Sequence, residues 1–169
     1  MDTLVFLRKQ VESMHQLVGA ALVDIDEAQL NWSPPGTLTP ISAILLHLAG
    51  TEDRFITAIQ AADQTCWQAG GWSARLGVSA LPVKGGDWSE FKHLSLPLAP
   101  LMEYLRSVQS VTKATLASLA EEDLTRSIAI GETSLPVVDL LSTLVVHGSH
   151  HAGEIASLRG VQGVRGLPF

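Results

Sequence analysis

The N-terminal part of the chain alternates regularly between apolar and polar positions. Its apolar residues recur at steps of three and four, at Leu4, Leu7, Val11, Met14, Val18, Ala21 and Ile25. This spacing puts them on one face of an α-helix, which we expect over residues 4–25. A non-helical connection must follow this helix, because Pro34 and Pro35 lack backbone amide donors and Gly36 favours a turn.

A second amphipathic stretch begins after this connection. Pro40 suits the first turn of a helix, Thr39 is a candidate N-cap, and the helix should end near Ala62. Its apolar face comprises Ile41, Leu45, Leu48, Phe55 and Ile59. The pattern predicts that this helix also buries one face in a core.

Residues 63–97 break the helical period. Paired glycines and a proline interrupt this segment, which carries Trp67, Trp72 and Trp88. A long irregular segment is unusual in a compact domain and is often functional. The tryptophans could line an apolar substrate pocket, but we expect at least two of them to seal the end of the helical core.

Two further helices are predicted in the C-terminal half. Small or apolar residues again step by three and four at Leu98, Leu101, Leu105, Val108, Thr112, Thr115 and Leu119, before an acidic turn at residues 121–123. The last helix has its interior positions at Val137, Leu141, Leu144, Gly148, His151, Ile155 and Leu158. Ser134 is its candidate N-cap, Pro136 lies near its first position, and Gly160 is a suitable stop.

No segment shows a convincing β-alternation. The simplest architecture is an all-α four-helix bundle with a long irregular insertion between the second and third helices, in a single domain spanning residues 1–169. Helices of about 20 residues run about 30 Å and suit shallow packing angles. Because the insertion can cross the bundle, the order of the helices stays open.

The composition argues against two classes of partner. Hydrophobic residues make up 46% of the 169 residues, which suffices for a continuous core. With a net charge of −6, the chain lacks a basic surface for a phosphate backbone, so we expect no nucleic-acid partner. The longest apolar run, residues 135–146, is interrupted by Asp139 and Ser142. Because a membrane span needs roughly 20 apolar residues, we also expect no membrane partner.

The N-terminus and the cysteine content favour a cytoplasmic protein. The chain starts directly with an amphipathic pattern and not with a secretory signal. Cys66 is the single cysteine, which excludes an internal disulfide framework. No base stands beside Cys66 in the sequence, so we expect an ordinary side chain and not a reactive thiol.

Three histidines are candidate metal ligands. His147 and His151 are four residues apart on the last predicted helix, so they differ by about 6 Å in height and about 40° around its axis, and both can reach one ion. His47 has a corresponding interior position on the second predicted helix. A shared ion would satisfy all three buried imidazoles at once. The alternative is that they are core or helix-flank histidines with ordinary hydrogen bonds.

The remaining histidines are weaker candidates. His150 could chelate an ion together with His147, but it lies on a row that faces away from the core, so we expect it to face solvent. We expect His15 and His93 at ordinary polar positions.

Acidic residues follow both predicted ligand segments. Glu154, the candidate catalytic residue, comes one turn after His151, where it could orient this ligand, accept a proton or pair with a cation. We favour the first of these roles. Glu52 could also lie near the metal, whereas a solvated helix face explains Asp53.

Two segments carry a family resemblance. The segment HLAGTEDRF begins at His47 and the segment HGSHHAGEIASLRG begins at His147. They resemble the H-L-A-x-x-E and H-x-x-x-H-x-G-Q/E-I motifs of the DinB-like (damage-inducible) metal-binding four-helix family. The order, separation and helix placement of the motifs agree with that family, and the resemblance extends over nearly the whole chain.

The resemblance implies a bundle whose His47, His147 and His151 bind zinc, nickel or a similar divalent ion, and it implies that homodimers are common. Family members with assigned activities include transferases and isomerases that depend on low-molecular-weight thiols such as bacillithiol or mycothiol. Glu154 stands where glutamine is frequent in the family. The DNA-damage label describes induction and does not imply DNA binding.

Three imidazole ligands leave at least one coordination position open, as in catalytic zinc sites. We therefore expect a divalent-metal-dependent enzyme with a small-molecule substrate, and the resemblance favours a small-thiol-dependent transferase. Two alternatives are a metal-dependent hydrolase, with Glu154 or Glu52 as the base, and a non-catalytic, dimeric binding module that the metal stabilises.

Overall fold

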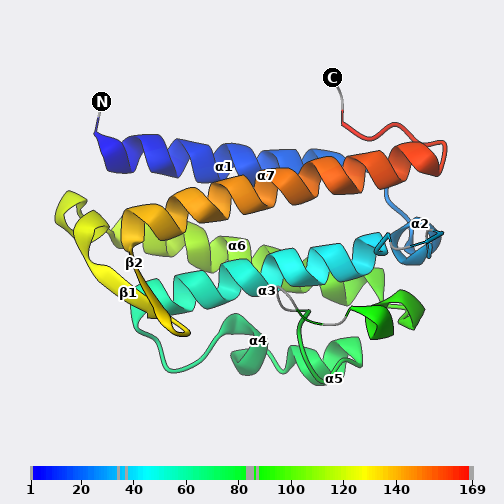
Figure 1. The fold of residues 1–169 in the computed structure, drawn as a ribbon, viewed down its shortest axis with the longest axis horizontal. Helices are drawn as coiled ribbons and strands as arrows, with labels where there is room; N and C mark the ends of the chain where they lie inside the picture. Colours follow the sequence, from blue (N-terminus) through cyan, green and yellow to red (C-terminus); the bar gives the residue numbers. More distant parts are fainter. Residues whose placement is uncertain (1, 34, 37, 83–85, 87, 168–169) are drawn as a thin grey trace.

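The computed structural model describes residues 2–167 except 34, 37, 83–85 and 87, and this part of the chain forms four long helices packed side by side (Figure 1). They are α1 (Thr3–Ala21), α3 (Ile41–Gln60), α6 (Leu98–Ser118) and α7 (Val137–Val161). The predicted all-α four-helix architecture is therefore confirmed. The shorter elements are α2 (Glu27–Asn31), α4 (Cys66–Ala69), α5 (Trp72–Leu76), the 3₁₀ helices η1 (Ser89–His93) and η2 (Glu121–Thr125), and strands β1 (Ser127–Ile130) and β2 (Thr133–Pro136).

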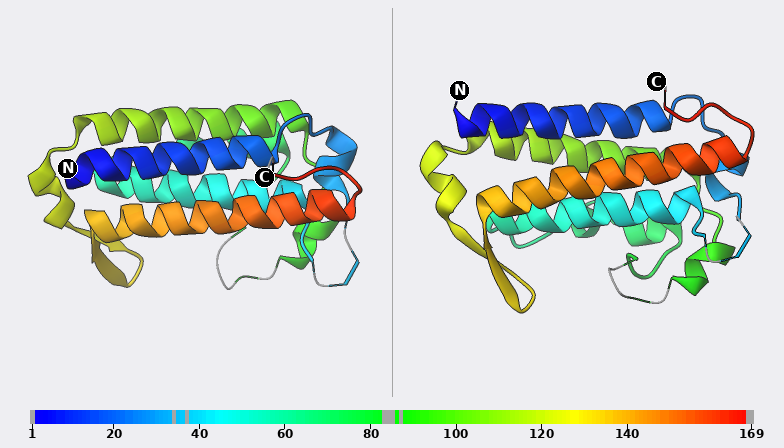
Figure 2. Two further views of the ribbon diagram at one scale, coloured as in Figure 1. Left: turned by 90° about the horizontal axis from the view of Figure 1, so that it is seen from above. Right: turned by 45° about the horizontal axis from the view of Figure 1, so that its top comes forward.

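Around the bundle the long helices follow the order α1, α7, α3, α6 (Figures 1 and 2). Helix α1 packs mainly on α7, and α3 packs on both α7 and α6, whereas α1 and α6 contact each other only sparsely. Helices α1 and α7 run in one direction, and α3 and α6 run in the opposite one. Because α3 and α6 are parallel neighbours, residues 61–97 must return along the bundle, which explains the length of the insertion.

The apolar face predicted for each long helix is buried in a shared core. Helix α3 is enclosed most completely, because α6, α7 and the insertion each cover part of its surface. Gly50 permits the close approach of the insertion: a Cβ atom at this position would lie 2.8 Å from Cδ1 of Leu81. Helix α3 is thus the most enclosed of the four long helices, in contact with α6, α7 and the insertion.

The first helix is shorter than predicted. Helix α1 ends at Ala21 and not at Ile25, because the backbone turns at Asp24, whose φ angle is +55°. The chain then starts the short helix α2 with a capping box, in which Asp26 accepts a hydrogen bond from the Gln29 amide and the Gln29 side chain accepts one from the Asp26 amide.

A small β-hairpin, which the sequence did not reveal, precedes α7 and is a minor addition to the all-α fold. Strands β1 and β2 pair antiparallel, with Ser127 opposite Pro136. Strands of four residues are too short for an alternating pattern to stand out in the sequence. Ser134 consequently lies in β2 and does not cap α7.

Prolines occupy the N-cap positions of α3 and α7. Pro40 is the N-cap of α3 in place of the predicted Thr39, and Pro136 is the N-cap of α7 in place of Ser134. Neither proline provides a side-chain hydrogen bond to the helix. Their fixed φ angles suit a helix start, so the two prolines correctly predicted where α3 and α7 begin.

The insertion is more regular than its sequence suggested, since it contains α4, α5 and η1. Trp72 is buried and Trp67 is half-buried, and both rings pack against Tyr104 of α6 with ring centroids 5.4 Å apart. The Arg75 guanidinium lies 3.8 Å above the Trp72 ring. Helices α4 and α5, which carry these two tryptophans, lie along the flank of the bundle (Figure 1), so the rings cover the side of α6 and do not seal the end of the core as expected.

Each long helix combines buried apolar residues with exposed polar ones, as expected of a packed bundle. Among the described residues, no helix combines the length and the apolar character needed to cross a bilayer.

Candidate metal centre

His47 is held in one orientation on α3. Its side chain is buried, and its Nδ1 lies 2.8 Å from the carbonyl oxygen of Pro82 in the insertion. Because a carbonyl only accepts, Nδ1 carries the hydrogen, and the neutral ring has its electron pair on Nε2. Burial lowers the pKa of His47 below its ordinary value, although the hydrogen bond to Pro82 opposes this shift. The neutral form, which can bind a metal, is therefore favoured.

His147 and His151 lie one turn apart on α7 and are both half-buried. The Nδ1 of His151 is 2.8 Å from Oε2 of Glu154. A carboxylate also only accepts, so this contact leaves the electron pair of the neutral His151 ring on Nε2. Glu154 thus lies beside a candidate ligand and accepts a hydrogen bond from its ring.

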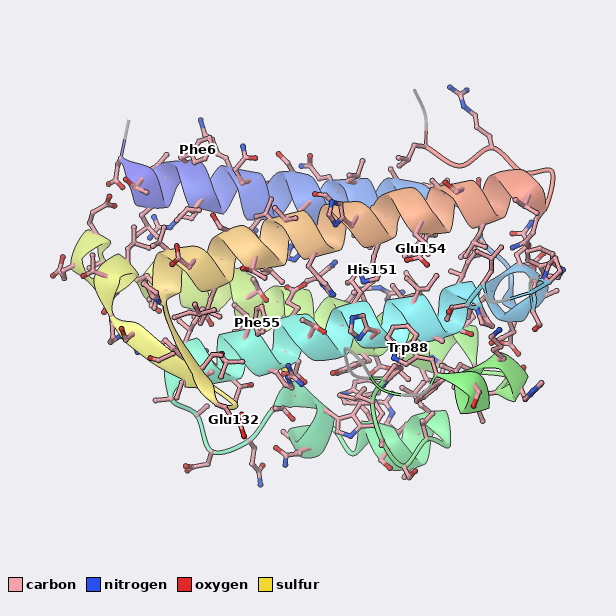
Figure 3. All side chains as sticks on the ribbon, viewed as in Figure 1. Phe6, Phe55, Trp88, Glu132, His151 and Glu154 are labelled. Atoms are coloured by element: carbon pink, nitrogen blue, oxygen red, sulfur yellow. The ribbon has the colours of Figure 1, made fainter. Side chains whose placement is uncertain are left out.

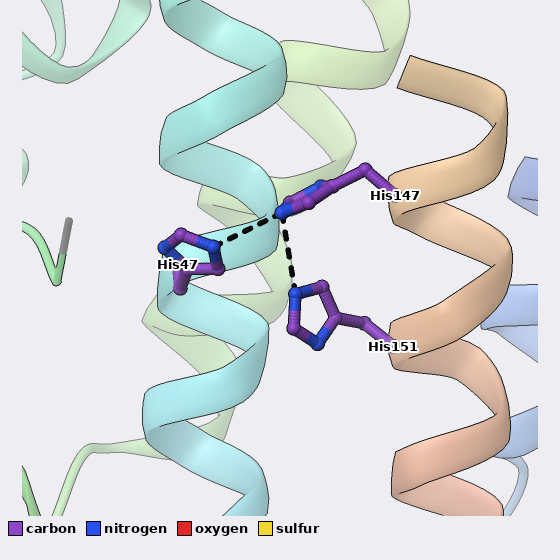
Figure 4. Close-up of side chains that lie close together, drawn as sticks. All are labelled: His47, His147 and His151. Carbon is purple, nitrogen blue, oxygen red and sulfur yellow. Dashed lines mark hydrogen bonds between the residues drawn. The ribbon is translucent and has the colours of Figure 1, made fainter. Parts of the chain in front are cut away.

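The three rings converge from two antiparallel helices (Figure 4). Nε2 of His147 lies 3.0 Å from Nε2 of His47 and 3.2 Å from Nε2 of His151. One ring nitrogen from each histidine lies within 4.8 Å of the other two. Two nitrogens of a tetrahedral zinc site, each about 2.05 Å from the ion, are separated by roughly 3.3 Å. The three histidines could therefore hold a divalent metal ion.

The number of ring N–H donors among the three histidines also favours a shared metal ion. With Nδ1 protonated in both His47 and His151, their neutral rings present electron pairs on Nε2 toward Nε2 of His147. The latter atom carries at most one hydrogen, which can be directed at only one of its two neighbours. One close contact therefore lacks a donor, and a shared cation would supply the missing positive charge.

The centre has an aromatic ring beside His47 and partly exposed side chains on the α7 side. The ring centroid of Trp88 lies 4.6 Å from that of His47. On the α7 side, the side chains of His151 and Glu154 are 18% and 43% exposed. Figure 3 shows His151 and Glu154 at the seam between α3 and α7, and Trp88 beside α3. His151 and Glu154 thus bring this side of the centre to the surface of α7.

Two groups that contact His47 could not be predicted from the sequence. The Pro82 carbonyl and the Trp88 ring both come from the insertion, and only the tertiary fold brings them to His47. The nearest signal was the presence of tryptophans in a long segment without helical period.

Glu52 does not join the three histidines. It is fully buried, and its Oε1 accepts hydrogen bonds from Thr112 of α6 and, at 2.8 Å, from Nε2 of His15 of α1. These partners belong to α6 and α1, and Glu52 is not part of the cluster of ligand atoms, so the structure does not support a role for Glu52 among the three histidines. The sequence placed His15 at an ordinary polar position and did not reveal this contact.

The other two histidines lie where the sequence predicts. His150 is exposed on α7 and does not belong to the cluster of ligand atoms, and His93 is exposed at the end of η1.

The expectation that Asp53 lies on a solvated face is wrong. Its side chain is 2% exposed and accepts hydrogen bonds from the backbone amides of Cys66 and Trp67, both at 2.8 Å, and from the Tyr104 hydroxyl at 3.0 Å. A carboxylate at the start of α4 satisfies amides that have no partner within the helix. Asp53 therefore ties the insertion to α3 and α6, and it is buried because the insertion covers this face.

Cys66 behaves as the sequence indicated. Burial, reinforced by the neighbouring Asp53 carboxylate, raises the pKa of the Cys66 thiol to about 11. The group stays protonated at neutral pH and lacks the thiolate character of a reactive cysteine.

Comparisons with known proteins address the fold and the family. The crystal structure of a conserved protein from Enterococcus faecalis matches 96% of this chain and 99% of its own, with a TM-score of 0.79 and 21% sequence identity. At this identity, the likeness shows the fold alone. A comparison with functionally curated proteins found no match. The sequence profile of the DinB superfamily matches residues 10–155, which include all three histidines, and the chain therefore belongs to the DinB superfamily.

Proposed function

We propose that this protein is a divalent-metal-dependent enzyme that transfers a small thiol to an electrophilic small-molecule substrate. The observation that carries the metal proposal is the convergence of the Nε2 atoms of His47, His147 and His151. Imidazole ligands suit zinc or nickel. Thiol transfer itself is supported by the resemblance to thiol-dependent members of the family, which is an argument by analogy.

Each residue at this centre would have a distinct role. The three histidines would hold the ion between α3 and α7, while the Pro82 carbonyl and Glu154 fix the rings of His47 and His151. When bound, the ion would supply Lewis acidity that lowers the pKa of a thiol or water at its open position. Trp88 would exclude water on the side of His47.

Thiol transfer is better supported than metal-dependent hydrolysis. A hydrolase needs a base placed to deprotonate water. The Oε2 of Glu154 is engaged by His151, and Glu52 lies outside the histidine cluster with its Oε1 engaged by His15 and Thr112. We therefore assign Glu154 as a positioning residue for His151 and not as a base.

A non-catalytic role is the second candidate, because the centre joins α3, α7 and the insertion. An ion held there could act only as a clamp that stabilises a binding module. Binding of a thiol at the metal distinguishes an enzyme from a clamp.

The family resemblance also supports a homodimer. We propose that each chain forms a single domain over residues 1–169. The lone Cys66, with its protonated thiol, is consistent with the cytoplasmic location that we propose. Light scattering on purified protein tests the assembly, and a monomer at all concentrations would contradict it.

The metal content of purified, untagged protein tests the centre. We expect about one zinc or nickel ion per chain, and loss of this ion in His47→Ala and His151→Ala. His150→Ala is the matched control, since it removes an exposed imidazole from the same turn of α7 and should retain the ion. Equal metal content in all four proteins would reject the three-histidine centre.

Cobalt substitution tests the thiol. Addition of cysteine or dithiothreitol to cobalt-loaded protein should produce a saturable thiolate-to-cobalt absorption band that is absent in His151→Ala. A loaded protein that shows no such band would reject thiol binding and favour the clamp.

A further inference from the structure

A groove of about 690 Å³ lies between α1 and α6. This seam is on the opposite side of the bundle from the α3/α7 seam that carries the metal centre, because the helices follow the order α1, α7, α3, α6 (Figure 2, left). Pockets for small molecules generally have volumes of about 300–1,000 Å³. The sparse contact between α1 and α6 thus leaves a space of the size that a metabolite occupies.

The charge of the groove is opposite to that of the chain. The whole chain has 11 Lys and Arg residues against 17 Asp and Glu residues. The groove is lined by three cations, Arg8, Arg106 and Lys113, and by a single carboxylate, Glu12. A local excess of positive charge on an acidic protein favours an anionic ligand.

Two of these cations are available to a ligand. Arg8 is engaged, because its guanidinium donates hydrogen bonds to the carbonyls of Leu116 and Leu119 at the end of α6. Arg106 and Lys113 are exposed, and within the described part of the chain neither forms an ion pair. They are seven residues apart on α6, which is about 10 Å along the helix.

A buried carboxylate stands behind the wall of the groove. Glu52 is fully buried and its Oε1 is 2.8 Å from Nε2 of His15, which lines the groove. Because the carboxylate only accepts, His15 uses its Nε2 hydrogen for Glu52, and Nδ1 is its remaining polar atom. Among the described residues, Oε2 of Glu52 has no hydrogen-bond partner. Glu52 therefore holds His15 in place from within the core.

The groove also offers apolar surface. Val11 and Leu116 form part of its lining, and the aliphatic stems of Arg106 and Lys113 extend this surface. A ligand that combines a charged group with a hydrocarbon body would satisfy both kinds of lining.

We propose that the α1/α6 groove is a second ligand site, which binds a small organic anion with a hydrocarbon body. The charged group lies between Arg106 and Lys113, and the hydrocarbon part lies against Val11 and Leu116. This site is independent of the metal centre and of the enzymatic proposal made for it.

Octanoate is the probe for this site, with acetate and octanol as matched controls that lack the hydrocarbon body and the charge, respectively. Each compound is titrated into ¹⁵N-labelled, zinc-supplemented full-length protein. We expect saturable shifts of α1 and α6 amides with octanoate, and binding that is weaker by about tenfold or more with either control. Absence of saturable binding, or equal binding of octanoate and acetate, would overturn the proposal.

Variants locate the binding. The double substitution Arg106→Gln and Lys113→Gln should weaken octanoate binding by about tenfold or more, whereas Lys9→Gln, which removes an exposed cation of α1 outside the groove, should leave it unchanged. Unaltered binding in the double variant, or shifts confined to α3 and α7, would reject the groove. The metal content of each variant is measured in parallel, so a failure of this proposal is distinguishable from a failure of the metal centre.

Discussion

The Nδ1 atom of His47 donates a hydrogen bond to the carbonyl oxygen of Pro82 across 2.8 Å and 35 residues of sequence. This one contact sets the tautomer of His47 and directs its electron pair toward His147 and His151. It also connects the insertion to α3 at the level of the three histidines. The orientation of a ligand therefore depends on a backbone carbonyl, a group that no side-chain motif contains.

Substitution of Glu154 should alter metal affinity without abolishing the site. Glu154→Ala removes the acceptor for His151 Nδ1, and we expect metal affinity to fall by about 10-fold to 100-fold. Glu154→Gln retains an acceptor oxygen and should lose less. Competition with a chelator measures both affinities, and an alanine variant with the affinity of the unmodified protein would contradict the assigned role.

The stability of the metal-free protein should depend on pH through His47. Its folded-state pKa lies below the ordinary value of 6.5, so between these two values the unfolded chain binds more protons than the folded chain. The contribution of His47 is complete above 6.5 and is lost as the pH falls toward the folded pKa. Urea unfolding of chelator-treated protein at about pH 7.5 and about pH 5 measures this loss. His47→Gln should lose less stability than the unmodified protein, and an equal loss would exclude His47 as the cause.

Gly148 should be intolerant of a side chain. A Cβ atom there would lie 2.3 Å from Sδ of Met14, a buried side chain of α1. Gly153 lies on the same helix, and a Cβ at that position meets nothing within 4 Å. Both changes to alanine gain similar helix propensity, so their difference isolates the steric clash. We expect Gly148→Ala to be less stable than Gly153→Ala by about 1–3 kcal/mol in urea unfolding. Equal stability would show that Met14 moves aside freely.

Asp53 should be important for stability although it lies outside the metal centre. Asp53→Ala leaves the amides of Cys66 and Trp67 and the Tyr104 hydroxyl without their acceptor. We expect a loss of about 3 kcal/mol or more in the free energy of unfolding, measured in urea. Asp63→Ala, at an exposed position, is the control and should change the stability by about 0.5 kcal/mol or less. Similar values for the two variants would contradict the assigned role of Asp53.

The sequence was most informative where periodicity operates over long segments. The four apolar faces, such as the seam from Leu4 to Ala21, predicted the long helices because a residue spacing of 3.6 is a local property of the chain. The spacing of His147 and His151 predicted their common direction for the same reason. Short elements were missed: α2 depends on one capping box, and the hairpin before α7 has only four residues in each strand.

Sequence alone thus determined the class of fold, the long helices and the residues that meet at the candidate metal centre. Only the tertiary structure decided that Pro82 orients His47, that Asp53 is buried beneath the insertion, and that Glu52 bonds to His15 and does not join the three histidines. The reason is geometric. A helical pattern specifies which side of a helix is apolar, but the partner of a polar group on that helix depends on how segments far apart in the sequence are packed against it.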